Sequence, residues 1–333
     1  MMRSVRNTAD SGDPALAAFL DSAEFKKQLD LLSCAEWSWG PLQRVKTRLL
    51  KCHPGKRCTF EIDLKTERGS YELIGKTFAA ERPDIYKSMV EIQQAGFGSD
   101  SQFAIPQPLT YVPSLRLLLE AKAQGPSVKE IFFTAESSEQ KEAAVRCAHW
   151  LAKFHGTAPL LGQVTSVDKL MCKSRSQARK LARLGGCFAE KSARLLEKLE
   201  AAASKLGIVE ICASHGEYNP THVLFENGRT VVIDWDGCQV RDPARDVATF
   251  IIVTKWLALE GTGSHRAFDS TADAFLQAYI TKRGPGILER IPFHWGAVCL
   301  KHAKYCMAYQ FERWEEKTMA LLEEGSSAVG LTH

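Results

Sequence analysis

The chain has 333 residues, of which 45% are hydrophobic and 25% charged, as expected of a soluble globular protein with one large or two smaller domains. Its formal net charge of +4 is too small to indicate nucleic-acid binding. No apolar run approaches the roughly 20 residues of a membrane-spanning helix, and the N-terminus lacks the apolar core of a secretory signal. We therefore expect a cytoplasmic protein that binds neither nucleic acid nor membrane. The oligomeric state is not indicated by the sequence.

The ten cysteines are scattered, and none forms a Cys-x-x-Cys pair. Cys52 and Cys58 are six positions apart, a spacing that suits neither a zinc site nor a compact disulfide framework. We therefore expect reduced thiols, several of them filling the core.

The first third of the chain is rich in predicted strands. Residues 1–40 are expected to form a polar tail followed by a helix over 14–33, with Asp13 as its N-cap. The predicted elements after it are a hairpin of 45–53 and 57–66 around Pro54-Gly55, a strand near 73–78, a helix over 83–96 and a strand over 116–121. We interpret residues 41–122 as one small β-rich lobe.

Residues 123–333 are expected to form a larger, mostly helical lobe, which makes the chain an α+β protein of two lobes. Its first long helix is predicted over 137–156, with a capping box of Ser137 and Gln140. Two helices separated by Gly185-Gly186 are predicted within 168–206, a helix over 245–259, and a single long helix over 295–324.

The most informative stretch is SHGEYNPTHVLFENGRTVVIDWDG, residues 214–237. Asn227-Gly228 is a strong signal for a two-residue hairpin turn, which would pair Glu226 with Arg229 and bring His222 opposite Ile233. His222 and Asp234 then leave the hairpin at the same end, with Glu217 and Asn219 in the preceding loop. The pattern predicts a cluster of groups that can bind a metal or accept a proton.

The stretch resembles the aminoglycoside phosphotransferase and choline kinase-like superfamily, small-molecule kinases with the protein-kinase fold. The resemblance rests on His215-Gly216-Glu217, position 222, Ile233-Asp234-Trp235 and Asp242-Pro243-Ala244-Arg245-Asp246. It extends over roughly residues 45–320, and it is specific in the block 215–248 and weaker before it. It implies a two-lobed protein-kinase-like fold, ATP and Mg²⁺ as cofactors, and a hydroxylated small molecule as acceptor.

The resemblance also implies roles for individual residues. Asp234 would bind Mg²⁺, Glu217 would act as the catalytic base, position 222 would be the second metal ligand, and His215 would brace the loop. For the nucleotide, it implies that Lys76 holds the α- and β-phosphates and that Glu91 orients it. The segment that contains Glu120 and Lys122 would be the hinge, whose backbone meets adenine.

Two positions depart from the family pattern. Glu217 stands where the family has Asp, and the extra methylene moves the carboxylate by about 1–1.5 Å, a misplacement that can reduce the rate about 100-fold. His222 stands where the family has Asn, and imidazole is a poor ligand for Mg²⁺. Asp236, Asn219 or water is then expected to supply the missing oxygen.

Alternatives to an active kinase follow from these departures. One is a pseudokinase that binds a nucleotide or another ligand with weak or no turnover. A third interpretation is a transition-metal site made by His215, His222, Asp234 and Asp236.

The acceptor is not identified by the sequence. Residues 168–205 contain ten Lys or Arg against four Asp or Glu. This excess of positive charge disfavours a polycationic aminoglycoside and suits a phosphorylated or carboxylated metabolite, unless the segment is only a solvated helical face.

Overall fold

The computed structural model describes residues 22–53, 55–207, 209–310 and 312–330. The chain divides into two compact units, residues 1–124 and residues 125–333. The predicted tail over 1–13, the first part of the helix predicted over 14–33 and Pro54 of the predicted turn lie outside the described residues. Within the described residues, no helix combines the length and apolar character needed to cross a bilayer.

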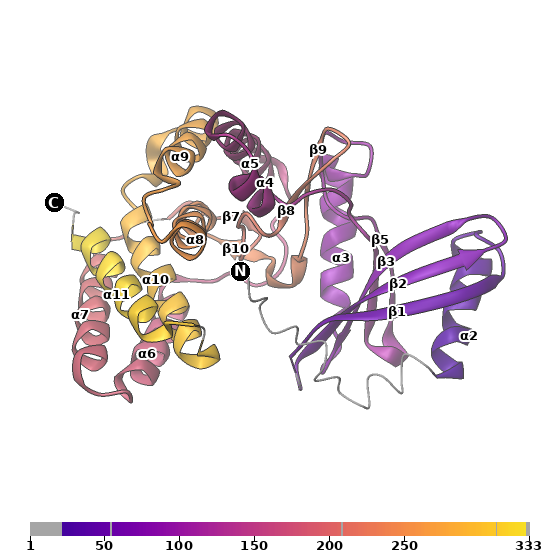
Figure 1. The fold of residues 1–333 in the computed structure, drawn as a ribbon, viewed down its shortest axis with the longest axis horizontal. Coiled ribbons are helices and arrows are strands. Elements are labelled where there is room, and N and C mark those ends of the chain that lie inside the picture. The colour runs from indigo at the N-terminus through magenta and orange to yellow at the C-terminus, as the bar shows by residue number, and fades with distance from the viewer. Residues whose placement is uncertain (1–21, 54, 208, 311, 331–333) are drawn as a thin grey trace. The chain divides into compact units, whose positions relative to one another are not determined.

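The first unit is built on an antiparallel sheet of five strands in the order β1-β2-β3-β6-β5 (Figure 1). These strands are β1 (Leu42–His53), β2 (Arg57–Thr66), β3 (Ser70–Phe78), β5 (Pro108–Val112) and β6 (Leu117–Ala121). The unit also contains α2 (Ala23–Leu31), α3 (Pro83–Ile92), the short strand β4 (Phe103–Ala104) and single turns at Leu32–Glu36, Gln93–Phe97 and Pro113–Leu115. The predicted hairpin is confirmed, with His53 opposite Arg57, whereas β5 was not predicted.

The core of this unit lies between α2 and one face of the sheet. Every second residue of β2 points into it, as period-2 alternation requires, and Phe25 and Leu29 of α2 cover that face. The core residues of the sheet are Phe60, Ile62, Leu64, Leu73, Leu117 and Leu119. This packing fixes the central strands β3 and β6, which carry the predicted nucleotide residues.

Cys52 and Cys58 correct the expectation that all the thiols are reduced. They are direct partners in the β1–β2 pairing, their Cα atoms are 4.1 Å apart, and the structure joins them in a disulfide. The short turn between the strands brings the two side chains together, an effect that the six-residue spacing alone does not reveal. The other eight cysteines are free thiols.

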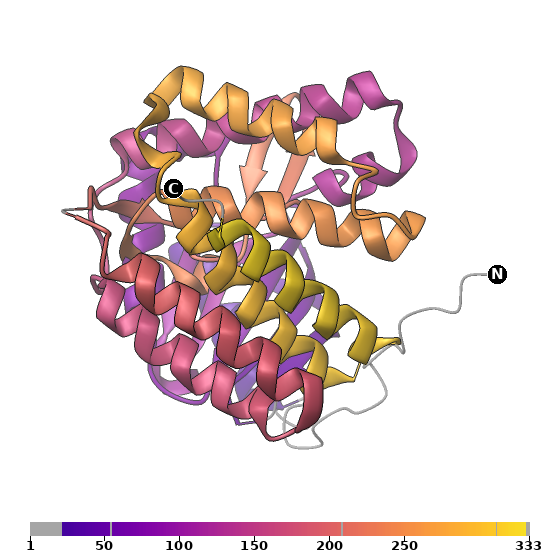
Figure 2. The ribbon, with the colours of Figure 1, turned by 90° about the vertical axis from the view of Figure 1, so that its left-hand side faces the viewer.

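The second unit is mostly helical. Its helices are α4 (Val128–Thr134), α5 (Ser137–Thr157), α6 (Val167–Ala182), α7 (Gly186–Ala203), α8 (Ala244–Thr262), α9 (Asp269–Arg283), α10 (Ile291–Tyr309) and α11 (Trp314–Gly330). Single turns of 3₁₀-helix lie at Trp235–Gly237 and Pro285–Ile287. Figure 2 shows α6 and α7, in pink, beside the yellow α11. Side chains of α6, α7, α10 and α11, together with Ile252 of α8, form one continuous hydrophobic core.

Two predictions for these helices were wrong. The single helix predicted over 295–324 is two helices, because Gln310 and Arg313 adopt left-handed backbone conformations that end α10 before α11 begins. Glu136, not Ser137, is the N-cap of α5, and Gln140 instead donates to the carbonyl groups of Phe132 and Ala135. A capping box does occur earlier, in α4, between Ser127 and Glu130.

Two short antiparallel ribbons lie among these helices. In one, β7 (Cys212–Ser214) pairs with β10 (Gln239–Arg241), so that Ser214 is opposite Gln239. In the other, β8 (Val223–Glu226) pairs with β9 (Arg229–Val232) around Asn227-Gly228, in the predicted register. The loops 215–222 and 233–238 each run from one ribbon to the other. The fold therefore brings together the two ends of the 214–237 stretch.

Candidate active site

The carboxylate of Asp246 holds the loop that begins at His215. It accepts hydrogen bonds from the hydroxyl of Ser214 (2.8 Å) and from the backbone N–H groups of His215 (2.9 Å) and Gly216 (3.1 Å). His155 Nε2 lies 3.3 Å from the same carboxylate. Burial, the largest single influence, would raise the pKa of Asp246, but the hydrogen bond and charge of His155, together with the charges of Arg241 and His215, hold that pKa well below its usual range. Asp246 therefore fixes the backbone of the residues directly before Glu217.

His215 is fully buried and joins the two loops of the site. Its Nε2 donates to the carbonyl oxygen of Ile233 (2.9 Å), and its Nδ1 accepts from the backbone N–H of Glu217 (3.3 Å). These two bonds define the neutral tautomer with the proton on Nε2. Burial, with the nearby His222, lowers the pKa of His215 to about 4. His215 thus ties the Glu217 loop to the Asp234 loop without carrying a charge.

The side chain of Glu217 reaches solvent and contacts a cation that the sequence did not point to. Its Oε1 forms an ion pair with Lys301 Nζ from α10, and the Glu217 side chain is 41% exposed. Burial, the largest single influence, raises the pKa of Glu217, but the charge and hydrogen bond of Lys301, together with the charges of His302 and Arg245, leave this pKa lowered. Glu217 is therefore a carboxylate at neutral pH, in direct contact with an ammonium group.

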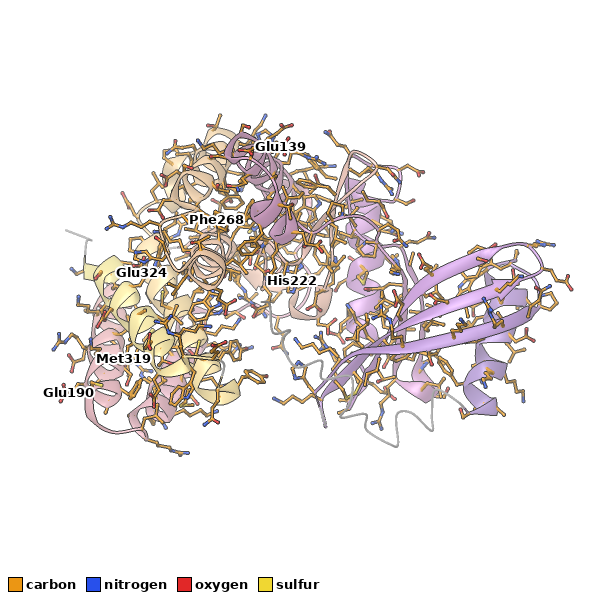
Figure 3. All side chains as sticks on the ribbon, in the orientation of Figure 1. Glu139, Glu190, His222, Phe268, Met319 and Glu324 are labelled. Carbon is orange, nitrogen blue, oxygen red and sulfur yellow. A yellow bond between two sulfur atoms is a disulfide. The ribbon has the colours of Figure 1, made fainter. Side chains whose placement is uncertain are left out.

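His222, labelled in Figure 3, lies at the end of the hairpin. Its Nε2 is 3.7 Å from Asp234 Oδ2. Asp234 has a left-handed backbone (φ 68°), which turns the chain out of the strand. His222 Nδ1 lies 3.0 Å from the Glu217 carbonyl oxygen and 3.2 Å from Asn219 Nδ2. In the tautomer that donates from Nδ1 to this carbonyl, Nε2 is the acceptor nitrogen on the side of Asp234.

The other two candidate metal residues are Asp236, two positions after Asp234, and Asn219, three positions before His222. Asp236 is half-buried, in the 3₁₀ turn Trp235–Gly237 that follows Asp234. The Asn219 Oδ1 accepts from the backbone N–H (2.8 Å) and the hydroxyl (2.5 Å) of Thr221, and its Nδ2 donates to the Glu217 carbonyl (2.7 Å). The Asn219 amide therefore braces the loop through both of its polar atoms.

The donor set fits a hard divalent cation that brings further ligands with it. Among the described residues, no three His, Cys, Asp or Glu side chains converge as a ready metal site. Mg²⁺ typically takes only one or two carboxylates from the protein and completes its octahedron with water and phosphate oxygens. Asp234 suits that role. His215 is not available as a ligand in the transition-metal interpretation, because both of its ring nitrogens form hydrogen bonds within the protein.

Two of the predicted nucleotide residues of the first unit lie on neighbouring strands. Lys76 of β3 and Glu120 of β6 are both buried, and Lys76 Nζ lies 3.3 Å from Glu120 Oε1. Glu91, which we expected to orient Lys76, is exposed on α3. The structure thus brings Lys76 together with Glu120, a carboxylate that the sequence assigned only to the hinge.

The hinge segment already uses part of its backbone. The N–H of Ala121 donates to the Gln107 carbonyl (2.9 Å), and the N–H of Lys122 donates to the Glu72 carbonyl (3.0 Å). The Lys122 side chain forms ion pairs with Glu61 and Glu72. An adenine contact would therefore use other backbone groups of this segment.

Trp235 packs in the core of the second unit. It is buried against Trp150 and Phe154 of α5, and its indole N–H donates to the Val232 carbonyl (2.8 Å). This packing holds the backbone between Asp234 and Asp236 in place.

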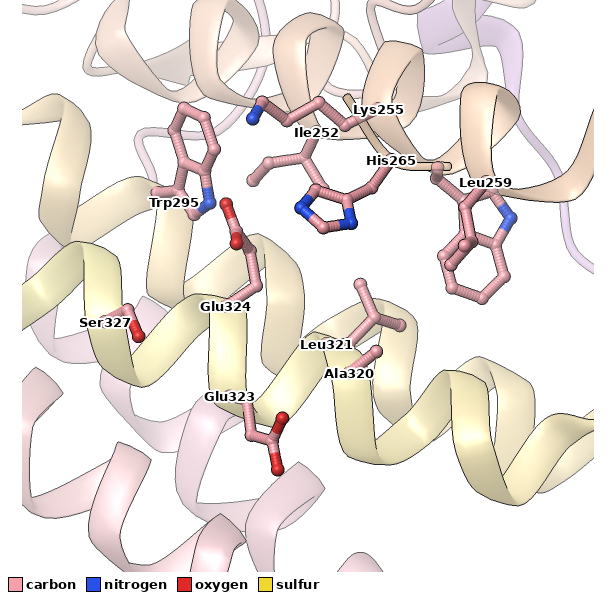
Figure 4. A pocket seen from close by; sticks show the side chains of 11 residues that line it. Ile252, Lys255, Leu259, His265, Trp295, Ala320, Leu321, Glu323, Glu324 and Ser327 are labelled. Atoms are coloured by element: carbon pink, nitrogen blue, oxygen red, sulfur yellow. The ribbon is translucent and has the colours of Figure 1, made fainter. Parts of the chain in front are cut away.

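A separate cavity of about 230 Å³ lies between α8, α10 and α11 (Figure 4). Trp256, Leu259, Trp295 and Leu321 give it apolar walls, and Lys255 and Glu324 lie at its edge. None of the predicted site residues lines it.

The sequence and the fold were compared with those of known proteins. Residues 99–291 match the sequence profile of the phosphotransferase enzyme family. No curated protein is significantly similar to the chain in sequence.

Several solved structures share the fold at low sequence identity. A thermostable mutant of aminoglycoside phosphotransferase APH(4)-Ia, in a ternary complex with AMP-PNP and hygromycin B, is 15% identical with a TM-score of 0.63, over 91% of this chain and 100% of that one. Choline kinase LicA from Streptococcus pneumoniae is 15% identical with a TM-score of 0.61, over 92% and 99%. Macrolide 2'-phosphotransferase MphH from Brachybacterium faecium is 18% identical with a TM-score of 0.52, over 88% and 97%. The expected protein-kinase-like α+β fold is therefore confirmed.

Proposed function

Because the chain belongs to the phosphotransferase enzyme family, we propose that it is an ATP-dependent kinase that phosphorylates a hydroxyl group of a small molecule. The observation that carries this proposal is the bracing of the Glu217 loop: Asp246 holds its start, and His215 ties it to the loop of Asp234. Phosphoryl transfer depends mainly on such positioning and on charge stabilisation, with little covalent chemistry by the protein.

Each residue has a specific task in this proposal. Lys76 holds the α- and β-phosphates of ATP, and Glu120 orients its ammonium group. Asp234 holds Mg²⁺, with Asp236 and His222 as further candidate ligands, and the bound cation would neutralise charge on the phosphates. The bond between the γ-phosphorus and the β,γ-bridging oxygen breaks, the acceptor oxygen bonds to that phosphorus, the hydroxyl proton passes to Glu217, and ADP leaves.

The first test is thermal unfolding of the full chain with AMP-PNP, with and without Mg²⁺. A ligand that binds only the native state at 100 times its Kd stabilises it by about 2.7 kcal/mol. We expect Mg-AMP-PNP to raise the Tm of the wild type and of the control Asp273→Asn, which changes an exposed carboxylate on α9. Lys76→Met should lose most of the shift, and Asp234→Asn should lose the part that depends on Mg²⁺. A wild type that does not respond to Mg-AMP-PNP would exclude this function.

A second candidate function, a pseudokinase, is favoured by the ion pair between Glu217 and Lys301. A carboxylate neutralised by an ammonium group is a weaker base for the acceptor proton. The two functions are separated by measuring ADP release across a panel of hydroxylated compounds. Release that Asp234→Ala abolishes supports the kinase. Nucleotide binding without release supports the pseudokinase.

A further inference from the structure

Two arginines beside the Glu217 loop have guanidinium groups that the protein does not fully use. Arg245, in the first turn of α8, is only 6% exposed, yet its Nε and Nη1 have no hydrogen-bond partner within the described part of the chain. Arg241, the last residue of β10, is half-buried, and its Nε has no partner there either. Its Nη2 lies next to Gly216, since a Cβ added to that glycine would be 3.4 Å away.

The nearby carboxylates are already engaged. Asp242 accepts from Arg290 Nε (2.8 Å) and lies 2.9 Å from His294 Nε2. Asp246 is occupied by Ser214 and the backbone of the Glu217 loop, and Glu217 itself is paired with Lys301. No ion pair of Arg241 or Arg245 is found among the residues that the structure describes. Both arginines thus lack a direct ion-pair partner in this part of the chain, although the charges of Asp246 and Glu217 act on them from further away.

Further positive charge surrounds the two arginines. Burial lowers the pKa of Lys301, and the charges of Arg245 and Arg241 lower it further, although Glu217 opposes them. Burial also lowers the pKa of Lys173 of α6, and Arg241 is the next largest cause. Burial lowers the pKa of Arg245 to about 10, again with Arg241 as the next cause. Cations that destabilise one another in this way are stabilised when an anion binds among them.

The arginines line a cavity of about 220 Å³. Arg241, Arg245, His294 and the carboxylate of Asp242 line it, and Val164, Val167 and Leu170, in and before the first turn of α6, give it apolar surface. The Asp242 carboxylate is paired with Arg290 and His294. Both the volume and the mixed lining suit a small organic anion.

We propose that the acceptor of the kinase carries a carboxylate or phosphate group, which binds to Arg241 and Arg245 while its hydroxyl is presented to Glu217. A buried guanidinium group without a direct ion-pair partner is unfavourable, so an anion that binds to it gains a charge-assisted interaction that the protein itself does not supply. Guanidinium groups form paired hydrogen bonds to carboxylate and phosphate alike. The same charge disfavours a cationic acceptor. The presentation of the hydroxyl to Glu217 rests on the proposed function, whereas the anion site does not.

The binding test uses the full chain without nucleotide, in sodium phosphate, sodium malonate or sodium chloride of equal ionic strength. Phosphate or malonate should raise the Tm of the wild type and of Arg179→Met, which removes an exposed arginine of α6. Arg245→Met and Arg241→Met should lose most of that shift. Equal shifts in all four proteins, or no shift in the wild type, would overturn the proposal. Since replacing an unpaired buried charge by an apolar group is often neutral or stabilising, Arg245→Met is expected to fold. If Arg245→Met does not fold, the Tm shift of Arg241→Met decides the test.

The acceptor test compares ADP release with glycerol, glycerate and glycerol 3-phosphate, which differ only in the anionic group. We expect at least a tenfold higher kcat/KM for one of the two anions than for glycerol in the wild type and Arg179→Met. Arg245→Met should reduce that preference to near unity. The better anion identifies the group as carboxylate or phosphate. A preference for glycerol would count against the proposal.

A third measurement separates this inference from the proposed function. Arg245→Met should keep the thermal shift given by Mg-AMP-PNP, because the arginines serve the acceptor. If it loses the nucleotide shift together with the anion shift, the arginines bind nucleotide phosphate and the acceptor site is disproved. If the wild type ignores Mg-AMP-PNP but still binds anions through Arg245, the kinase function fails while the anion site remains.

Discussion

The ammonium group of Lys301 lies against the carboxylate of Glu217, although the two residues are 84 positions apart in the chain. Lys301 comes from the middle of α10, and Glu217 from the loop between β7 and β8. The ammonium group keeps Glu217, which we propose as the catalytic base, in its ionised form. Lys301 is in turn influenced by the positive charges of Arg241 and Arg245.

Lys301→Met should make Glu217 a stronger base that protonates more easily. Among the influences that lower the pKa of Glu217, Lys301 is the largest, so its removal should raise that pKa. Because the base must be deprotonated, the acid limb of the kcat/KM profile should move to higher pH. The measurement is ADP release between pH 4 and 8, with Lys282→Met, an exposed lysine of α9, as control. An unmoved acid limb would show that Glu217 does not act as the base.

The buried His215 should make the protein less stable in weak acid. Its folded pKa of about 4 lies below the value of about 6.5 expected when unfolded, so the unfolded chain binds the proton first as the pH falls. The stability is complete above pH 6.5 and is lost progressively towards pH 4. At pH 5 the loss from this residue is about 2 kcal/mol. Urea unfolding at pH 7 and pH 5 measures it.

His215→Gln keeps a donor for the Ile233 carbonyl and removes the titration. The decline between pH 7 and pH 5 should therefore be shallower in His215→Gln than in His265→Gln, which changes an exposed histidine. Equal declines in the two variants would mean that His215 is not held neutral by burial.

Gly216→Ala should damage the Glu217 loop more than backbone strain alone explains. Gly216 has a φ of +89°, and an added Cβ would overlap the carbonyl oxygen of Gly237 in the neighbouring loop. Gly228→Ala is the matched control, because Gly228 also has a positive φ (+81°) but no atom within 4 Å of the added Cβ. A left-handed alanine costs about 1–2 kcal/mol, which is the loss expected for Gly228→Ala. Gly216→Ala should exceed it in urea unfolding and should also lower turnover. Similar losses would show that the two loops do not pack this closely.

Local sequence signals located the framework of the site. Asn227-Gly228 fixed the hairpin register, and that register placed His222 beside Asp234, as the 3.7 Å separation shows. Short-range patterns suffice here because the turn residues themselves determine which positions are paired. The left-handed Gln310, which divides the last helix in two, carries no comparable signal because glutamine rarely ends a helix in this way.

Contacts between segments that are distant in the chain could not be predicted from the sequence. Lys301 is one of several lysines in the helix predicted over 295–324, and only the packing of α10 against the Glu217 loop gives it a partner. Arg245 occupies a variable position of the Asp-Pro-x-x-Asp pattern, where nothing indicates that its side chain is buried. Lys76 lies on a strand, as predicted, but its observed carboxylate partner is Glu120 of the neighbouring strand. Burial and pairing depend on the tertiary fold, which local patterns do not encode.

His222→Asn should change which divalent cation the site prefers. In the wild type an imidazole lies beside Asp234, and imidazole suits Ni²⁺ better than Mg²⁺. An amide oxygen in its place is the kind of ligand that Mg²⁺ prefers. The apparent Kd of each ion, measured by calorimetry in the presence of AMP-PNP, should fall for Mg²⁺ and rise roughly tenfold for Ni²⁺, the scale on which altered ligands change metal affinity. His265→Asn should match the wild type for both ions. If His222→Asn also leaves both affinities unchanged, His222 is not a ligand, and its role is limited to bracing the loop through the Glu217 carbonyl.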